Sequence, residues 1–402
     1  MTRRAPLRAL GLALTLAAAA IVWRATSETP PPARVKRTLP VSLRLPGNAP
    51  ALAWPGEGQA AVQAQGVAGA SASTPGETPV PIASIAKVMT AYLTLLAHPL
   101  AAGQEGFVVT VTPAEAAEER EREALDESVV SVRSGERLTE RQALQALLLP
   151  SANNIAALLA SYQGGMRAFL ARMNATAERL GMRSTTYTDP SGYAATTVST
   201  AADQLKLAQA AMRLPAFAAL VDERAVALPV AGRVLNVNAL VGHDGYVGIK
   251  TGSDSAAGGC LMFAKRALVS NRPVTILGVV LGQRAGAFVE AALAGAQRLG
   301  DSAAAALHLQ TVLAAGSRVL SVSDPDGRRT LGATSGALRT LGWAGMSLRV
   351  NVSLRAPARQ LRRGAPLATV SLAGGVPTSA TAAVATAPLA GPSLSWRLEH
   401  LL

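Results

Sequence analysis

A serine and a lysine three residues apart are the first candidates for chemistry in this chain. Ser84-Ile85-Ala86-Lys87 stands where a loop enters a helix-like segment, and this spacing puts the hydroxyl and the amine on one helix face. A lysine activates a serine when burial or nearby cations disfavour its ammonium form, and a helix start offers N–H groups to an oxyanion. A helix cap with a solvated lysine is the ordinary alternative. Lys87 lies in an otherwise uncharged segment, which favours the catalytic interpretation.

Two further polar motifs follow. Ser151-Ala152-Asn153 stands between Pro150 and an apolar helix-like segment, where a serine N-cap is the alternative interpretation. Lys250-Thr251-Gly252 ends a strand-like segment and precedes Ser253. A lysine and a threonine at a strand end can bind a carboxylate, and Gly252 would let a substrate backbone approach the strand edge. A polar strand end with a turn glycine is the alternative for this motif.

Helices and strands must position these motifs. Thr139 and Gln142 predict a capping box, Gly181 ends a helix-like segment, and Thr200 predicts another helix start. The pattern predicts an α+β fold of three layers, with helices around an antiparallel sheet. We expect helices over 84–98, 115–127, 139–149, 151–162, 166–180, 200–212 and 285–299. We expect a hairpin around Gly232 over 226–237, and strands over 128–133, 246–250, 258–264 and 273–281.

Composition and charge narrow the class of protein. The 402 residues carry a net charge of +13, which suits a polyanionic neighbour such as a cell envelope. The basic residues are not interleaved with aromatics, so we expect no nucleic-acid partner. The single Cys260 excludes an intramolecular disulfide and a cysteine-based metal cluster.

The two ends of the chain differ from its middle. Residues 1–24 combine N-terminal arginines with an apolar run, which predicts a signal peptide or a membrane anchor and an extracytoplasmic protein. Residues 25–50 are proline-rich and basic, so we expect a linker. Residues 306–402 alternate in short runs separated by Gly, Pro and Asp, which predicts a small β-rich domain. The last residues of this domain, from Trp396 on, are expected to form a packed strand or turn rather than an amphipathic helix at a membrane surface.

The three motifs together, in this order and context, resemble those of the serine D-Ala-D-Ala carboxypeptidases, the low-molecular-mass penicillin-binding proteins. Residues 81–91, 147–159 and 248–252 look like the family's three motif regions, and Asp189-Pro190-Ser191-Gly192 resembles its middle region. The resemblance covers about residues 50–300. It implies a carboxypeptidase domain of the penicillin-binding/β-lactamase-like fold over 51–305, followed by the β-rich domain. The family's second motif commonly reads Ser-Gly-Asn, whereas Ala152 stands here.

The resemblance also implies a reaction on peptidoglycan stem peptides. Ser84 would attack the carbonyl between two D-alanines while Lys87 accepts its proton. Ser151, helped by Lys250, would pass a proton to the departing D-alanine. Water would then hydrolyse the acyl-enzyme. β-Lactams would acylate Ser84 by mimicking the dipeptide, and no metal or cofactor would be needed.

The remaining implied roles are in substrate binding. Asn153 would hydrogen-bond the substrate amide, and Thr251 with Lys250 would hold the terminal carboxylate beside Gly252. The backbone N–H groups of Ser84 and Ser253 would form the oxyanion hole.

Four other classes of protein compete with this interpretation. A class A β-lactamase would add a loop Glu-x-x-Leu-Asn, and the nearest candidate, Glu178, lacks that motif. A metallopeptidase or a Ser-His-Asp hydrolase is disfavoured because His-Glu-x-x-His and Gly-x-Ser-x-Gly are absent from the sequence. A catalytically idle wall-binding protein on the same fold is disfavoured by the intact Ser84, Lys87 and Lys250.

Overall fold

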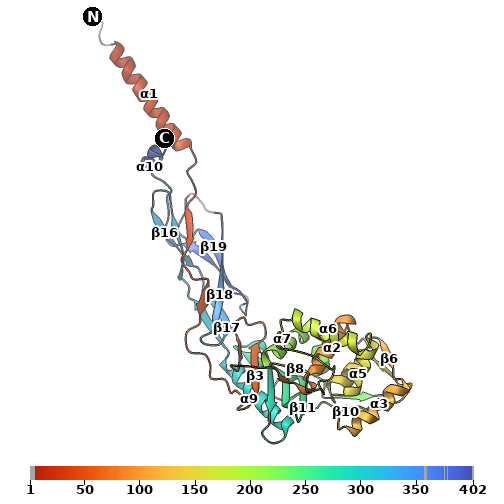
Figure 1. Ribbon diagram of the computed structural model, residues 1–402. Helices are drawn as coiled ribbons and strands as arrows, with labels where there is room; N and C mark the ends of the chain where they lie inside the picture. The colour runs from red at the N-terminus through yellow and green to blue at the C-terminus, as the bar shows by residue number, and fades with distance from the viewer. Residues whose placement is uncertain (1–4, 357–359, 375, 378, 401–402) are drawn as a thin grey trace. The chain divides into compact units, whose positions relative to one another are not determined.

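The computed structural model describes residues 5–356, 360–374, 376–377 and 379–400. They form two compact units (Figure 1). One unit spans Ala49–His308 and carries all three polar motifs, and the other combines Met1–Asn48 with Leu309–Leu402. The first unit therefore lies close to the limits expected for the carboxypeptidase domain, whereas the second draws on both ends of the chain.

The motif-bearing unit is built on a five-stranded antiparallel sheet. Its strand order is β11-β12-β13-β3-β4, so β11 forms one edge. The three longest strands contain the apolar runs expected from the sequence and extend beyond them. The strands are β3 (Gln59–Ala64), β4 (Ser71–Ser73), β11 (Tyr246–Asp254), β12 (Gly258–Val269) and β13 (Arg272–Gln283).

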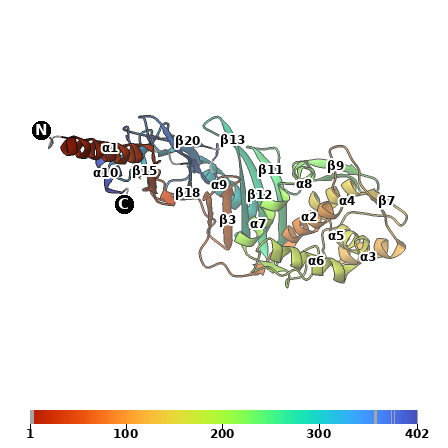
Figure 2. The same ribbon diagram turned by 90° about the horizontal axis from the view of Figure 1, so that it is seen from above.

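Helices cover both faces of this sheet. On one face, Gly295 of α9 (Phe288–Ala306) approaches Val280 of β13. The preceding residue of the strand, Val279, points to the opposite face, because successive side chains in a strand alternate. It belongs to the main core, which it shares with the other helices. Figure 2 shows α2, α4, α5 and α6 grouped on the β11 side of the sheet. The expected α+β, three-layer fold is confirmed.

The remaining elements of this unit are short. A 3-10 turn, η1 (Ala83–Ala86), leads directly into α2 (Lys87–Ala97). The other helices are α3 (Pro113–Ala124), α4 (Glu140–Leu148), α5 (Asn153–Tyr162), α6 (Met166–Arg179), α7 (Ala201–Ala211) and α8 (Pro215–Val221). Small two-stranded pairs join β5 (Val80–Pro81) to β8 (Val198–Ser199), β6 (Val108–Thr110) to β7 (Arg137–Thr139), and β9 (Ala225–Leu228) to β10 (Gly232–Leu235).

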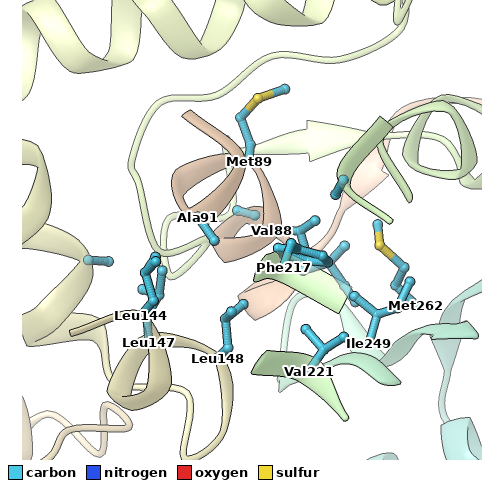
Figure 3. Close-up of a cluster of buried hydrophobic side chains, with 14 of the residues drawn as sticks. Val88, Met89, Ala91, Leu144, Leu147, Leu148, Phe217, Val221, Ile249 and Met262 are labelled. Carbon is cyan, nitrogen blue, oxygen red and sulfur yellow. The ribbon is translucent and has the colours of Figure 1, made fainter. Parts of the chain in front are cut away.

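The main core is mainly aliphatic and surrounds α2 (Figure 3). Burial of each large apolar side chain stabilises the fold by roughly 1.5–3 kcal/mol. A core with few aromatic side chains therefore needs many buried aliphatic ones to reach the same stability. The side chains in Figure 3 converge from α2, α4, α8, β11 and β12. They include Val88, Met89, Ala91, Leu144, Leu147, Leu148, Phe217, Val221, Ile249 and Met262.

Local signals placed several helix starts correctly. The capping box is formed, because Thr139 Oγ1 accepts from the Gln142 N–H while the Gln142 side chain accepts from Thr139 N–H. Thr200 caps α7 by accepting from Asp203 N–H. The expected strand over 128–133 was wrong, since these residues form no strand and Asn154 instead bonds Val130 through its side chain.

The second unit contains a seven-stranded sheet with its own core. The strand order is β1-β15-β16-β20-β19-β18-β2. Its core is again aliphatic and includes Val319, Leu320, Val322 and Val370. The strands are β1 (Arg34–Arg37), β2 (Ser42–Arg44), β15 (Arg318–Ser323), β16 (Arg329–Thr334), β18 (Ser347–Leu354), β19 (Pro366–Leu372) and β20 (Ala380–Ala385), with β14 (His308–Leu313) pairing β17 (Leu338–Gly342) separately.

The segment expected to be a linker, 25–50, is instead part of this sheet. Its strands β1 and β2 pair with β15 and β18 at the two edges. Arg37 also donates to the Val350 carbonyl, and Leu45 is buried. The edge strands of the C-terminal sheet offer unpaired N–H and C=O groups. These groups pair with the backbone of residues 34–37 and 42–44, which therefore form strands rather than a solvated linker.

Both chain ends carry a helix within the second unit. The apolar α1 (Ala5–Ser27) includes Leu10–Ser27, which is long and apolar enough to cross a membrane, as is a signal sequence at this position. The last residues were expected to form a strand or turn, but form α10 (Leu394–Glu399), capped by the Ser393 hydroxyl accepting from Trp396 N–H. Arg397 donates to the carbonyls of Ala25 and Glu28. Two of the N-terminal arginines on which the export prediction depends, Arg3 and Arg4, lie outside the described residues.

Candidate active site

Ser84 and Lys87 meet at the turn between η1 and α2. Lys87 Nζ lies 2.6 Å from Ser84 Oγ. The turn is tight, since Ala83 adopts a positive φ of 46°. A Cβ on Gly192 would lie 1.8 Å from the Ala83 carbonyl oxygen, so only a glycine fits against this turn. Tertiary packing therefore holds the Ser84 hydroxyl against the lysine amine.

Lys87 is fully buried, and its charged form is disfavoured. Burial lowers the pKa of Lys87 well below its usual value, and the charge of Lys250 lowers it further, whereas the carboxylates of Asp189 and Glu127 act in the opposite direction. Its amine also donates to the Ser191 carbonyl at 3.1 Å. The result is a positioned amine that can accept a proton from a hydroxyl.

The loop with Asp189-Pro190-Ser191-Gly192 holds that carbonyl in place. One carboxylate oxygen of Asp189 accepts from the backbone N–H groups of Ser191, Gly192 and Tyr193. The other accepts from the Thr197 hydroxyl. The sequence marked this loop as similar to the family's middle region without assigning a role. The structure shows that it orients the partner of Lys87.

Ser151 and Asn153 come from the turn before α5. Ser151 is buried with a positive φ of 73°, and the N-cap position belongs to Ala152, which makes no side-chain cap bond. The N-cap alternative for Ser151 was therefore wrong. Within the described chain, no hydrogen bond joins the Ser151 hydroxyl to Ser84 or Lys87.

Glu127 is a site residue that sequence reasoning missed. Asn153 Nδ2 donates to Glu127 Oε2 at 2.6 Å, and Arg122 forms an ion pair with the same carboxylate at 3.0 Å. The Asn153 Oδ1 atom is buried and has no hydrogen-bond partner among the described residues. Glu127 ends a Glu- and Arg-rich run that is typical of a solvated helix face, so only its contact with the buried Asn153 reveals it.

The third motif lies on the edge strand β11, against the turn that carries Ser84. A Cβ on Gly252 would lie 2.9 Å from Ser84 N and 3.1 Å from Ile85 N. Gly252 therefore allows the backbone of Ser84 and Ile85 to approach β11 closely. Thr251 is buried, and Ser253, two residues further along the strand, is exposed. The structure thus brings the first and third motifs together.

Lys250 is the second buried lysine of the site. It is 1% exposed, and burial lowers its pKa to about 7. Its amine donates to the Thr251 carbonyl at 3.0 Å. A lysine so poised gains charge readily when an anion arrives, because a nearby negative charge favours the ammonium form. No group of three or more potential metal-ligating side chains was found among the residues that the structure describes.

Residues 72–285 match the family model of the D-alanyl-D-alanine carboxypeptidases. A D-alanyl-D-alanine endopeptidase of Pseudomonas aeruginosa is 32% identical over 66% of this chain and 80% of its own length. An Escherichia coli D-alanyl-D-alanine endopeptidase is 32% identical over 49% of this chain and 62% of its own.

The solved Streptomyces K15 DD-transpeptidase has the same fold as the motif-bearing part of the chain. Its crystal structure matches with a TM-score of 0.54 and 26% identity, covering 64% of this chain and all of that one (100%). The D-alanyl-D-alanine carboxypeptidase DacD of Francisella tularensis matches 87% of this chain and 95% of its own, with a TM-score of 0.57 and 17% identity, which shows the fold alone. With the family model matched over more than half its length, the chain belongs to the family of serine-type D-alanyl-D-alanine carboxypeptidases, enzymes that act on peptidoglycan.

Proposed function

We propose that this enzyme hydrolyses the terminal D-Ala-D-Ala bond of peptidoglycan stem peptides through a Ser84 acyl-enzyme. The observation that carries the proposal is the 2.6 Å contact between Ser84 Oγ and the fully buried Lys87 amine. Neutral Lys87 removes the hydroxyl proton as Ser84 attacks the carbonyl carbon. The backbone N–H groups of Ser84 and Ser253 stabilise the oxyanion, which is supported by the contact distance between Gly252 and the nucleophile turn.

The second and third motifs serve the leaving group and the substrate amide. Ser151, with Lys250, returns a proton to the departing D-alanine amine. Lys250 and Thr251 bind its carboxylate, and Asn153 hydrogen-bonds the amide of the acyl part. The burial of Ser151, Asn153, Lys250 and Thr251 supports these roles, because buried polar groups at one site keep a fixed geometry.

Penicillin sensitivity follows from the same chemistry. A β-lactam carries a carboxylate and a strained amide, so it acylates Ser84 and leaves slowly. We further propose that the enzyme works outside the cytoplasm, with α1 serving as export signal or membrane anchor. The apolar character of Leu10–Ser27 supports this location.

The decisive experiment combines labelled penicillin with a pentapeptide substrate. We expect stable labelling of the wild-type enzyme, no labelling of Ser84→Ala, and loss of one D-alanine from the pentapeptide by mass spectrometry. Fast release of hydrolysed penicillin would instead identify a β-lactamase. If the wild-type protein binds no labelled penicillin and leaves the pentapeptide intact, it is an idle wall-binding protein.

A further inference from the structure

The groove between the β9–β10 hairpin and the loop that leads into β11 is a second candidate site. It is open and has a volume of about 630 Å³. Three basic side chains line it, namely Arg224, Arg233 and His243. Of the described residues that line the groove, none is acidic and none belongs to the three polar motifs. The groove is therefore a basic site that the proposed mechanism does not use.

Arg224 is held at the groove by its neighbours. Its Nη2 lies 3.3 Å from His243 Nε2, so the guanidinium and the imidazole lie side by side. A Cβ on Gly242 would lie 3.0 Å from Arg224 Cδ, so the glycine leaves room for the arginine side chain. Asp244, which follows His243, is exposed and does not line the groove. An incoming anion would meet a guanidinium that is already in place.

The two carboxylates that precede Arg224 in the sequence are engaged elsewhere. Asp222 forms an ion pair with Arg266 at 3.4 Å, and Glu223 accepts a hydrogen bond from Gln145 at 2.7 Å. Within the part of the chain that the structure describes, no ion pair involves either arginine of the groove. Both guanidinium groups are therefore available to an anion from outside the protein.

Asn238 independently indicates a ligand. It lines the groove and is only 2% exposed. Its Oδ1 accepts from the Leu240 N–H at 3.2 Å, which orients the amide group. Its Nδ2 is buried and has no hydrogen-bond partner among the described residues. Because a buried donor without a partner costs free energy, a ligand oxygen in the groove would supply what is missing.

The number of donors favours a phosphate over a carboxylate. Two guanidinium groups, an imidazole and an amide line the groove. A carboxylate has two oxygens, and a single guanidinium can bind both of them. A phosphate ester offers three strong acceptor oxygens, so it can accept from several of these donors at once.

The size and the apolar residues of the groove favour an organic phosphate over a free ion. Ala225, Leu235 and Val241 also line the groove. Its volume of about 630 Å³ lies within the range of roughly 300–1,000 Å³ that is typical of pockets for organic ligands. A free phosphate ion would leave most of this space and the apolar side chains without contacts.

We propose that this groove binds the phosphate group of an organic phosphate, such as a sugar phosphate, which is a ligand distinct from the peptide substrate. Arg224 and Arg233 bind the phosphate oxygens, Asn238 Nδ2 donates to one of them, and the apolar residues contact the organic part. The net charge of +13 favours the approach of such an anion. This inference goes beyond the proposed function and does not depend on it.

The test measures the binding of three probes to the full chain by calorimetry in a phosphate-free buffer. The probes are glucose 1-phosphate, inorganic phosphate and glucose. We expect glucose 1-phosphate to bind at least about fivefold more tightly than inorganic phosphate, because only the ester buries apolar surface of the groove. Glucose lacks the phosphate and should show no measurable binding.

Two variants remove the two kinds of donor. Arg224→Ala/Arg233→Ala and Asn238→Asp should each lower the affinity for glucose 1-phosphate roughly tenfold or more, because hydrogen bonds to a charged group are lost. Asn238→Asp keeps the acceptor for the Leu240 N–H, so its melting temperature should match that of the wild type. Arg272→Ala removes an exposed arginine of β13 outside the groove and is the matched control, which should bind like the wild type.

Labelled penicillin separates the groove from the catalytic site. Protein acylated at Ser84 should bind glucose 1-phosphate as tightly as free protein, and the groove variants should be labelled like the wild type. Loss of ester binding after acylation would place the ester in the catalytic site and overturn the proposal. If penicillin fails to label the protein, the proposed function is rejected, while the calorimetric comparison still decides what the groove binds.

Three calorimetric results would overturn the proposal. They are no binding of glucose 1-phosphate by the wild type, equal binding by the wild type and the double arginine variant, and equal affinity for inorganic phosphate and the ester.

Discussion

At the residue scale, the proposed mechanism depends on two lysines whose ammonium forms are disfavoured by burial. Lys87 must be neutral to accept the serine proton, whereas Lys250 must be charged to hold a carboxylate. Burial lowers the pKa of Lys87 well below its usual value and lowers that of Lys250 to about 7. The mechanism therefore needs one lysine without its proton and the other with its proton at the same pH.

The first prediction is a bell-shaped pH dependence of acylation. A lysine is charged below its pKa, so the rate rises as Lys87 loses its proton and falls as Lys250 loses its own above about 7. The measurement is the second-order acylation rate with fluorescent penicillin from about pH 5 to about pH 10. Lys250→Arg, which stays charged, should move the alkaline decline upward. A rate that rises only near the ordinary lysine pKa would contradict this account of Lys87.

The second prediction concerns Glu127, which holds the amide of Asn153. Glu127→Ala leaves the buried Asn153 Nδ2 without its partner, and a buried unsatisfied donor costs about 1–3 kcal/mol. Asn153 then no longer keeps its position for the substrate amide, so we expect acylation to slow roughly tenfold to a hundredfold. Glu127→Gln keeps an acceptor and should retain most of the rate. Equal losses in both variants would show that the charge, rather than the hydrogen bond to Asn153, is what matters. The measurement is the acylation rate of both variants, after their melting temperatures have been shown to be equal.

The residues that sequence reasoning found are those with local spacing. Ser84 and Lys87 are separated by one helical turn, so their pairing could be predicted from the chain alone. Glu127 could not, because its partner Asn153 lies 26 residues away and its own neighbours form a charged run. Contacts of that kind depend on tertiary packing rather than on a motif.

At the scale of elements, the site is assembled where the edge strand β11 meets the turn η1. Gly252 allows this contact, since any Cβ there would meet the backbone nitrogens of Ser84 and Ile85. The capping box of Thr139 and Gln142 and the long apolar strands could be predicted, because they are local patterns. The strands β1 and β2 could not, since their partners β15 and β18 lie far along the chain.

The third prediction follows from that contact. Gly252→Ala forces β11 and η1 apart, and overpacking of this kind costs about 1–3 kcal/mol. We expect acylation to fall at least about tenfold, together with a lower melting temperature. Gly56→Ala is the control, because nothing lies within 4 Å of a Cβ at that position. Unchanged acylation in Gly252→Ala would mean that the turn tolerates displacement from the strand.

At the scale of the whole molecule, the two units have separate hydrophobic cores. The three polar motifs lie in the unit spanning Ala49–His308, while both chain ends contribute to the β-rich unit. An N-terminal deletion that removes β1 and β2 should therefore damage the sheet of the β-rich unit without removing any side chain of the proposed catalytic site.

The fourth prediction tests this separation with two truncated variants. Removing residues 1–27 deletes α1 but keeps β1 and β2, so we expect a protein with nearly unchanged melting behaviour that labels with penicillin. Removing residues 1–48 deletes both edge strands and exposes the edges of β15 and β18, which lowers the unfolding temperature of the β-rich unit. Calorimetry measures the transitions, and labelled penicillin reports on Ser84. Loss of labelling in the longer deletion alone would show that the intact β-rich unit is required for the nucleophile to act.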